Sequence, residues 1–340
     1  MPAADAGRSN AVAGAAGPTD PVAPLWAVAA DAALSPPVLA DESLYVGGDD
    51  DRVRALDART GDRRWRQAVG APAATPWVVD DALYVPTDGG IVALGTAAGS
   101  ERWRVPTPDR AAVVAAAHGI YWLSTGDPPV VVGLDRGDGS ERWRTEIGDP
   151  WDRPLFAGPE RVFSSGTHDV RFWRLDAGTG DVVGKEPRYG NDFPAEQFYR
   201  DGTVYATDSF FGKVHAGAVA EGGHGWTRGV KAGGRTALVG DGERVYYLAN
   251  RGDEPGLYAL SAADGAVEWT VDVTTERVGR PVVAGESVLV RTDDALRAFD
   301  PADGAERWAL SGDAFGERIV VADDLVYTTA DGTVRAFRPP

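Results

Sequence analysis

Six residues in polar, loop-like segments of this chain have side chains suited to holding a ligand or a protein partner. One of these segments, GDPWDRP (148–154), combines an indole ring with an arginine. Binding surfaces favour aromatic rings and arginine, because both combine a wide contact area with a polar or charged end. The set therefore predicts recognition of a partner more than bond-making chemistry, and it comprises Trp151, Arg153, His168, Phe210, Phe211 and Arg251.

Motifs for catalysis or metal binding do not emerge from the same sequence. The chain has four histidines and no cysteine, and no two histidines have the paired spacing of a zinc site. The fingerprints of a nucleophile elbow, a P-loop and a dinucleotide fold are also missing. We assign no catalytic residue and no metal ligand from these patterns.

The elements that must position the six residues follow from a repeat of about 40 residues. Phrases such as ALDARTGDRRW (55–65) and AFDPADGAERW (298–308) recur along the chain and end in tryptophan. A wide ring at a fixed place in each copy can fill the wedge between neighbouring copies, which gives these residues a structural docking role. The docking tryptophans are Trp26, Trp65, Trp103, Trp143, Trp226, Trp269 and Trp308.

One copy, residues 36–70, contains four short runs of apolar residues separated by Asp-rich and Gly-rich turns. That pattern predicts a four-stranded antiparallel meander, and its repetition predicts an all-β, eight-bladed β-propeller almost without helices. The last copy has only three strands, so we expect the N-terminal strand at 25–30 to complete it. The predicted domains are a disordered lead-in (1–21) and one propeller (22–340).

Strand order should place the six candidate residues on one edge of the ring. Trp151 and Arg153 belong to the link between the third and fourth blades, and the other four lie in turns between second and third strands. Tryptophans within strand patterns, at positions 77, 122 and 173, are expected in the core. The same edge should carry a ring of turn acids, which either attract cations or only serve as turn residues. They are Asp50, Asp88, Asp127, Asp169, Asp208, Asp253, Asp293 and Asp331.

Two copies depart from the repeat. The fourth has Gly184 where tryptophan is due, and the fifth (215–226) carries an additional residue and lacks the Leu-Asp pair. Such irregular copies either mark a functional sector or reflect drift that the neighbouring copies compensate.

The motif A-x-D-x-x-T-G-x-x-x-W resembles the docking motif of the PQQ-like propeller superfamily. That superfamily includes quinoprotein alcohol dehydrogenases and the propeller lipoprotein BamB. The resemblance covers residues 22–340 and implies the fold. For a dehydrogenase it would also imply PQQ, a Ca²⁺ held by Glu, Asn and Asp, and in many members a vicinal disulfide. This chain has no cysteine, and no residues match the calcium ligands.

Composition suggests the environment more than the ligand. The net charge is -17, and only three of 34 basic residues are lysine. Abundant acid with scarce lysine and no cysteine indicates a salt-adapted microbe, since molar salt screens self-repulsion. No basic patch stands out, which argues against nucleic acid. There is no signal segment or membrane span, so the expected location is the cytoplasm, or the exterior if a signal segment is missing from this sequence.

These observations favour a non-catalytic propeller that binds a protein or peptide through its loop face, as a monomer and without a cofactor. A PQQ- and calcium-dependent quinoprotein dehydrogenase with an atypical site is the first alternative. The second is a sensor module for a small polar molecule.

Overall fold

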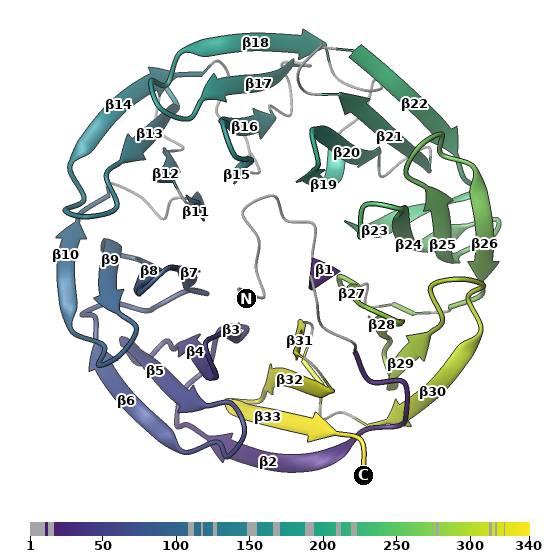
Figure 1. Cartoon of the computed structure of the whole chain (residues 1–340), viewed down its shortest axis with the longest axis horizontal. Helices are drawn as coiled ribbons and strands as arrows, with labels where there is room; N and C mark the ends of the chain where they lie inside the picture. The colour runs from purple at the N-terminus through teal and green to yellow at the C-terminus, as the bar shows by residue number, and fades with distance from the viewer. Residues whose placement is uncertain are drawn as a thin grey trace.

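Eight antiparallel sheets form a closed ring around a central axis in the computed structural model of this chain (Figure 1). The elements in the described ranges are all strands, which confirms the all-β, eight-bladed prediction. The structure describes residues 11–12, 17–107, 112–116, 118–124, 128–147, 155–165, 171–187, 194–208, 212–218, 223–273, 275–276, 279–312, 315–316, 318–322 and 324–340.

Each blade has its first strand nearest the centre of the ring and its fourth strand on the outer rim (Figure 1). The first four blades comprise β3 (Val38–Ala40), β4 (Ser43–Gly47), β5 (Arg52–Asp57) and β6 (Arg63–Ala68); β7 (Trp77–Val79), β8 (Ala82–Thr87), β9 (Gly90–Gly95) and β10 (Glu101–Val105); β11 (Ala112–Ala116), β12 (Gly119–Ser124), β13 (Val130–Leu134) and β14 (Glu141–Glu146); and β15 (Leu155–Ala157), β16 (Arg161–Ser165), β17 (Arg171–Asp176) and β18 (Val182–Pro187).

The remaining blades follow the same order, except that the eighth takes its outer strand from the beginning of the chain. They comprise β19 (Pro194–Arg200), β20 (Thr203–Asp208), β21 (Lys213–Ala218) and β22 (Gly223–Gly229); β23 (Ala232–Gly240), β24 (Arg244–Gly252), β25 (Gly256–Ser261) and β26 (Val267–Val271); β27 (Val282–Ala284), β28 (Ser287–Arg291), β29 (Ala295–Phe299) and β30 (Glu306–Ser311); and β31 (Ile319–Ala322), β32 (Leu325–Ala330), β33 (Thr333–Arg338) and β2 (Ala23–Ala29).

Ring closure depends on β2, which pairs antiparallel with β33 and places Trp26 opposite Ala336. The prediction that the N-terminal strand completes the last blade is therefore confirmed. Pairing between the two ends of the chain leaves no open blade at the seam, and an open sheet edge there would invite pairing with another chain.

Parts of the segment expected to precede the propeller also contact it. The two-residue strand β1 (Ala11–Val12) pairs in parallel with β27, the innermost strand of the seventh blade (Figure 1). Gly17 and Pro18 are buried, and the Pro18 carbonyl accepts a hydrogen bond of 2.9 Å from the Ser287 hydroxyl. In the described ranges, contacts with the propeller thus begin before residue 22.

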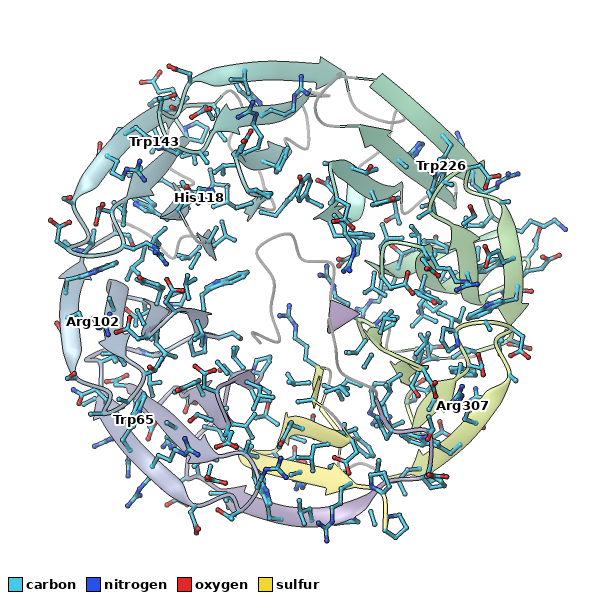
Figure 2. All side chains as sticks on the ribbon, in the orientation of Figure 1. Trp65, Arg102, His118, Trp143, Trp226 and Arg307 are labelled. Atoms are coloured by element: carbon cyan, nitrogen blue, oxygen red, sulfur yellow. The ribbon has the colours of Figure 1, made fainter. Side chains whose placement is uncertain are left out.

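The docking tryptophans join each blade to the next through one recurring hydrogen bond. Six of the seven indole Nε1 atoms donate to a backbone carbonyl in the turn that joins the third and fourth strands of the following blade, and the indole of Trp308 donates to the N-terminal segment. Trp65, Trp143 and Trp226 lie toward the outer part of the ring (Figure 2). The donor–acceptor pairs are Trp26–Ala58, Trp65–Thr96, Trp103–Arg136, Trp143–Ala177, Trp226–Ala262, Trp269–Pro301 and Trp308–Pro18.

The turns that receive these indoles are shaped by the Asp and Gly of the repeated phrase. In the fourth blade, Asp176 Oδ1 accepts hydrogen bonds from the backbone amides of Gly178 and Thr179, which closes the turn. Gly180 has φ +75°, and a Cβ there would lie 2.5 Å from the ring of Trp143. Glycine is therefore required both by the backbone conformation and by the indole packed against it.

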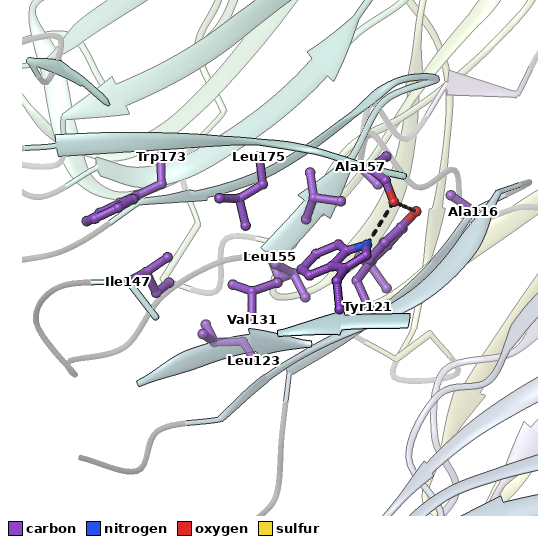
Figure 3. Close-up of a cluster of buried hydrophobic side chains, with 13 residues drawn as sticks. Ala116, Tyr121, Leu123, Val131, Ile147, Leu155, Ala157, Trp173 and Leu175 are labelled. Carbon is purple, nitrogen blue, oxygen red and sulfur yellow. Dashed lines mark hydrogen bonds between the residues drawn. The ribbon is translucent and has the colours of Figure 1, made fainter. Parts of the chain in front are cut away.

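The core is divided into layers between neighbouring blades. Between the third and fourth blades, Trp143 and Tyr121 both donate to the Ala177 carbonyl at 3.1 Å, and their rings stack 5.6 Å apart (Figure 3). Trp173 lies in the same layer, and Trp122 lies in the layer between the second and third blades. Both are buried, as the sequence predicts, and Trp77 packs against these two layers while partly exposed.

The fourth blade lacks a docking tryptophan and fills the space in another way. Arg174 pairs opposite Gly184, and a Cβ on Gly184 would lie 2.3 Å from the Arg174 guanidinium. In the third blade the sizes are reversed, because Trp143 covers Gly133. In the fourth blade the large side chain thus lies on the third strand, and in the third blade it lies on the outer strand.

Candidate functional site

One face of the ring collects the turns between second and third strands together with the links between blades. The four strands of a blade alternate in direction, so these two kinds of connection must lie at the same end. We call this the link face. Of the six candidate residues, only Arg251 lies among the described residues; outside them fall Trp151, Arg153, His168, Phe210 and Phe211.

Arg251 lies at the open end of an unusually long hairpin, away from the turn that joins its two strands. Its strands, β23 and β24, have nine residues each, and Arg251 pairs opposite Gly233 close to the link face. The side chain is exposed, and its Cβ and Cγ would lie 2.8 Å from a Cβ placed on Gly234. The hydrocarbon stem therefore rests on the hairpin while the guanidinium faces solvent.

Asn250, the neighbour of Arg251, fixes this hairpin to the rest of the link face. Its Oδ1 accepts from the Arg235 amide at 2.9 Å, and its Nδ2 donates to the Glu276 carbonyl at 3.2 Å. The Glu276 amide in turn donates to Asp293 Oδ2 at 2.5 Å. The link between the sixth and seventh blades is thus held from both sides, so that the loops around Arg251 have a defined position.

The ring of turn acids is not a uniform band of negative charge in the described residues. Asp293 is engaged by a backbone amide, and Asp331 has φ +49°, the conformation of a turn residue. Asp50 is surrounded by arginines. Asp127 and Asp169 lie outside the described residues, as does the side chain of Asp208.

The arginines around Asp50 are the feature that the sequence analysis missed. Arg54 donates to both Asp50 carboxylate oxygens, at 3.0 and 2.5 Å, and Arg66 donates to Oδ2 at 3.4 Å. Arg52 lies 3.7 Å from the same carboxylate. These contacts hold the pKa of Asp50 below its ordinary value, the hydrogen bond from Arg54 being the largest cause. The run of arginines in RVRALDARTGDRRWRQ (52–67) of an acidic chain was the available signal.

An ion pair joins two blades that are not neighbours. Arg280, just before β27 of the seventh blade, pairs with Glu196 on β19 of the fifth blade. This pair therefore connects the fifth blade directly to the seventh.

Nothing in the described part of the chain gathers three or more His, Cys, Asp or Glu side chains in a way that could hold a metal ion. Within the same ranges, no helix has the length and apolar character needed to cross a membrane.

Comparison with known sequences shows which protein family has these repeats. A family model described as outer membrane protein assembly factor BamB matches residues 19–113, 88–216 and 200–340. A curated relative, outer membrane protein assembly factor BamB of Yersinia pestis, is 34% identical over 111 residues. That alignment covers 28% of this chain and 25% of the relative, so the chain matches about a quarter of the length of this protein.

Solved structures share the architecture at low identity. BamB from Moraxella catarrhalis has a TM-score of 0.73 at 16% identity, with 94% of this chain and 100% of that chain covered. Quinohemoprotein alcohol dehydrogenase from Comamonas testosteroni has a TM-score of 0.68 at 14% identity, with 93% and 76% covered. At these identities the likeness shows the PQQ-like propeller fold, as the sequence resemblance implied.

Proposed function

The chain belongs to the family of outer membrane protein assembly factor BamB, and from that premise we propose that it is a non-catalytic scaffold whose link face binds a protein or peptide partner. The observation that carries this proposal is the long β23–β24 hairpin. It presents the exposed Arg251 on a rigid ring, with its position fixed by the Asn250 hydrogen bonds. Loops held by a rigid scaffold are the usual place for recognition.

Docking bonds between blades support a scaffold role because they leave little freedom for the blades to move. Apart from the fourth blade, every blade has an indole bonded to the adjacent blade or to the N-terminal segment. A surface that is already ordered loses less conformational entropy on binding, which favours affinity. The five candidate residues outside the described ranges, Trp151, Arg153, His168, Phe210 and Phe211, belong to this proposal as further contacts on the same face.

The family also bears on where the protein works. The relatives are named for assembly of outer membrane proteins, which supports the exported alternative. The cytoplasmic expectation finds no support in the comparisons. We propose an exported protein whose partner is another protein at the cell envelope.

Single-cysteine crosslinking tests which face binds, because the chain has no cysteine of its own. Asp253→Cys places a thiol on the link face, and Glu243→Cys places one on the opposite face of the same blade, where the native side chain is 89% exposed. Each variant carries a maleimide photocrosslinker and is irradiated in extracts of cells that express the protein. We expect a discrete product from Asp253→Cys that weakens when Arg251→Ser is added.

The matched variant decides the outcome. Glu243→Cys should give no such product, because its thiol faces away from the partner. Equal products from both faces, or a product from Glu243→Cys alone, would contradict a binding role for the link face.

A further inference from the structure

The seam between the eighth and first blades holds a groove of about 530 Å³. It runs between β2, the outer strand of the eighth blade, and the β5–β6 hairpin of the first blade, which lie side by side in the ring (Figure 1). Its apolar lining includes Val28, Leu34, Leu56 and Val334. Its charged lining consists of four arginines and three acids: Arg52, Arg54, Arg63, Arg66, Asp31, Asp50 and Asp62.

At the link-face end of this groove, two arginines lie directly opposite each other in neighbouring strands. Arg54 on β5 pairs in register with Arg66 on β6. Like charges in directly opposed positions destabilise a sheet unless something compensates them. In the other seven blades, the corresponding pairs contain at most one cation: Val92–Arg104, Val132–Arg144, Trp173–Lys185, His215–Thr227, Tyr258–Thr270, Arg297–Ala309 and Arg335–Ala27.

One carboxylate forms ion pairs with both of these arginines and with a third. Within the described ranges, Asp50 is the acid that pairs with Arg52, Arg54 and Arg66. The groove as a whole is lined by four arginines and three carboxylates, so it carries one positive charge in excess. Arg54 is held by its bidentate contact and is nearly buried, while the side chains of Arg52 and Arg66 remain 42% and 39% exposed. Two guanidiniums are thus placed at the groove with hydrogen-bond donors left for a ligand.

We propose that this groove binds an oxyanion with two negative charges, of the phosphate type. Such an anion can contact both exposed guanidiniums, Arg52 and Arg66, and its oxygens accept the paired N–H groups of arginine. The apolar lining beside the arginines fits the organic part of a phosphate monoester better than it fits free phosphate. The site lies between two blades and does not depend on the partner proposed for the link face.

Titrations with inorganic phosphate, phenyl phosphate and benzoate, followed by calorimetry in the same buffer, test this assignment. Both phosphates should bind saturably, and benzoate, with a single charge, at least tenfold more weakly than phenyl phosphate. Tighter binding of phenyl phosphate than of inorganic phosphate assigns the site to an ester, and equal binding assigns it to the free ion. Benzoate binding as tightly as phenyl phosphate would overturn the dianion assignment.

Two substitutions locate the site. Arg66→Gln should weaken phosphate binding about tenfold or more, the loss of one charge-assisted contact. Arg104→Gln removes the arginine at the same position of the second blade, where Glu101 already pairs with it, and should leave binding within about twofold. Arg52→Gln provides a second, exposed change at the groove, and melting temperatures verify folding. Absence of saturable binding, or equal losses in Arg66→Gln and Arg104→Gln, would overturn the proposal.

Discussion

The indole Nε1 of Trp308 donates a hydrogen bond of 3.2 Å to the carbonyl of Pro18, 290 residues earlier in the chain. Elsewhere a docking indole bonds to the turn between the third and fourth strands of the next blade. In the eighth blade no such turn joins β33 to β2, because the two strands come from distant parts of the sequence. The N-terminal segment therefore supplies the acceptor carbonyl for the indole of the seventh blade.

Deleting residues 1–18 should destabilise the ring, because Trp308 and Ser287 both lose the Pro18 acceptor. We expect the free energy of unfolding to fall by about 1–3 kcal/mol, the cost of leaving a buried donor unsatisfied. Deletion of residues 1–10 alone keeps this acceptor and serves as the control. Urea denaturation measures the free energy of unfolding of both deletion variants. Equal stability of the two would contradict a stabilising role for the Pro18 acceptor.

Gly180→Ala should cost more stability than Gly202→Ala, although both glycines have positive φ, +75° and +82°. A Cβ on Gly180 meets the Trp143 ring at 2.5 Å, whereas a Cβ on Gly202 meets nothing within 4 Å. We expect about 1 kcal/mol for Gly202→Ala from the backbone conformation, and about 1–3 kcal/mol more for Gly180→Ala from overpacking. Thermal unfolding of the two variants checks the difference, and equal losses would show that the indole does not restrict the turn.

The exchange of sizes in the fourth blade predicts coupling between Arg174 and Gly184. Gly184→Trp alone forces an indole onto the Arg174 guanidinium and should destabilise strongly. Adding Arg174→Ala should recover at least about 1 kcal/mol of that loss, the size of coupling seen between contacting residues. A double-mutant cycle in urea measures the coupling, and strict additivity would show that the two positions are independent.

Stability at low pH should depend on Asp50. Because its folded pKa lies below the ordinary value of 3.8, the ionised group stabilises the protein above about pH 4, and this contribution is lost as the pH falls through the folded pKa. Asp50→Asn should lower the free energy of unfolding by about 2 kcal/mol at pH 7 and by less below pH 3. Asp253→Asn, at the same turn position of the sixth blade, should change little at either pH. A constant difference between wild type and Asp50→Asn from pH 7 to pH 2 would contradict this role.

The ring was predictable from the repeat. Each tryptophan, turn glycine and Leu-Asp pair is needed for the structure of one blade, so that each copy of the phrase predicts one blade. The Pro18 acceptor could not be predicted in this way, since a backbone carbonyl is present in every residue. The pairing of Arg54 with Arg66 depends on the bulge between Ala55 and Leu56. This bulge shifts the register between β5 and β6, and the spacing of residues in the sequence does not reveal it. The contact between Arg174 and Gly184 was also not predicted, because the repeat shows only that tryptophan is missing and not which residue lies opposite that position.

The candidate residues were harder to judge from sequence than the fold. Strand order predicts Arg251 in a turn on the link face. The structure places it at the link-face end of β24, where it is still paired with Gly233 and not yet in the turn, because this strand is longer than the repeat suggests. The groove beside Asp50 was missed because its two walls, β2 and the β5–β6 hairpin, come together only when the ring closes. Recognition sites between elements require that long-range geometry.

The central claim, that this propeller is a scaffold and not a quinoprotein enzyme, is tested most directly by titration with PQQ and Ca²⁺ in multimolar KCl. Intrinsic tryptophan fluorescence and melting temperature are followed together. A scaffold predicts no saturable change in either signal up to high micromolar PQQ. Saturable quenching with a raised melting temperature, followed by alcohol-dependent dye reduction, would contradict the account and identify an enzyme.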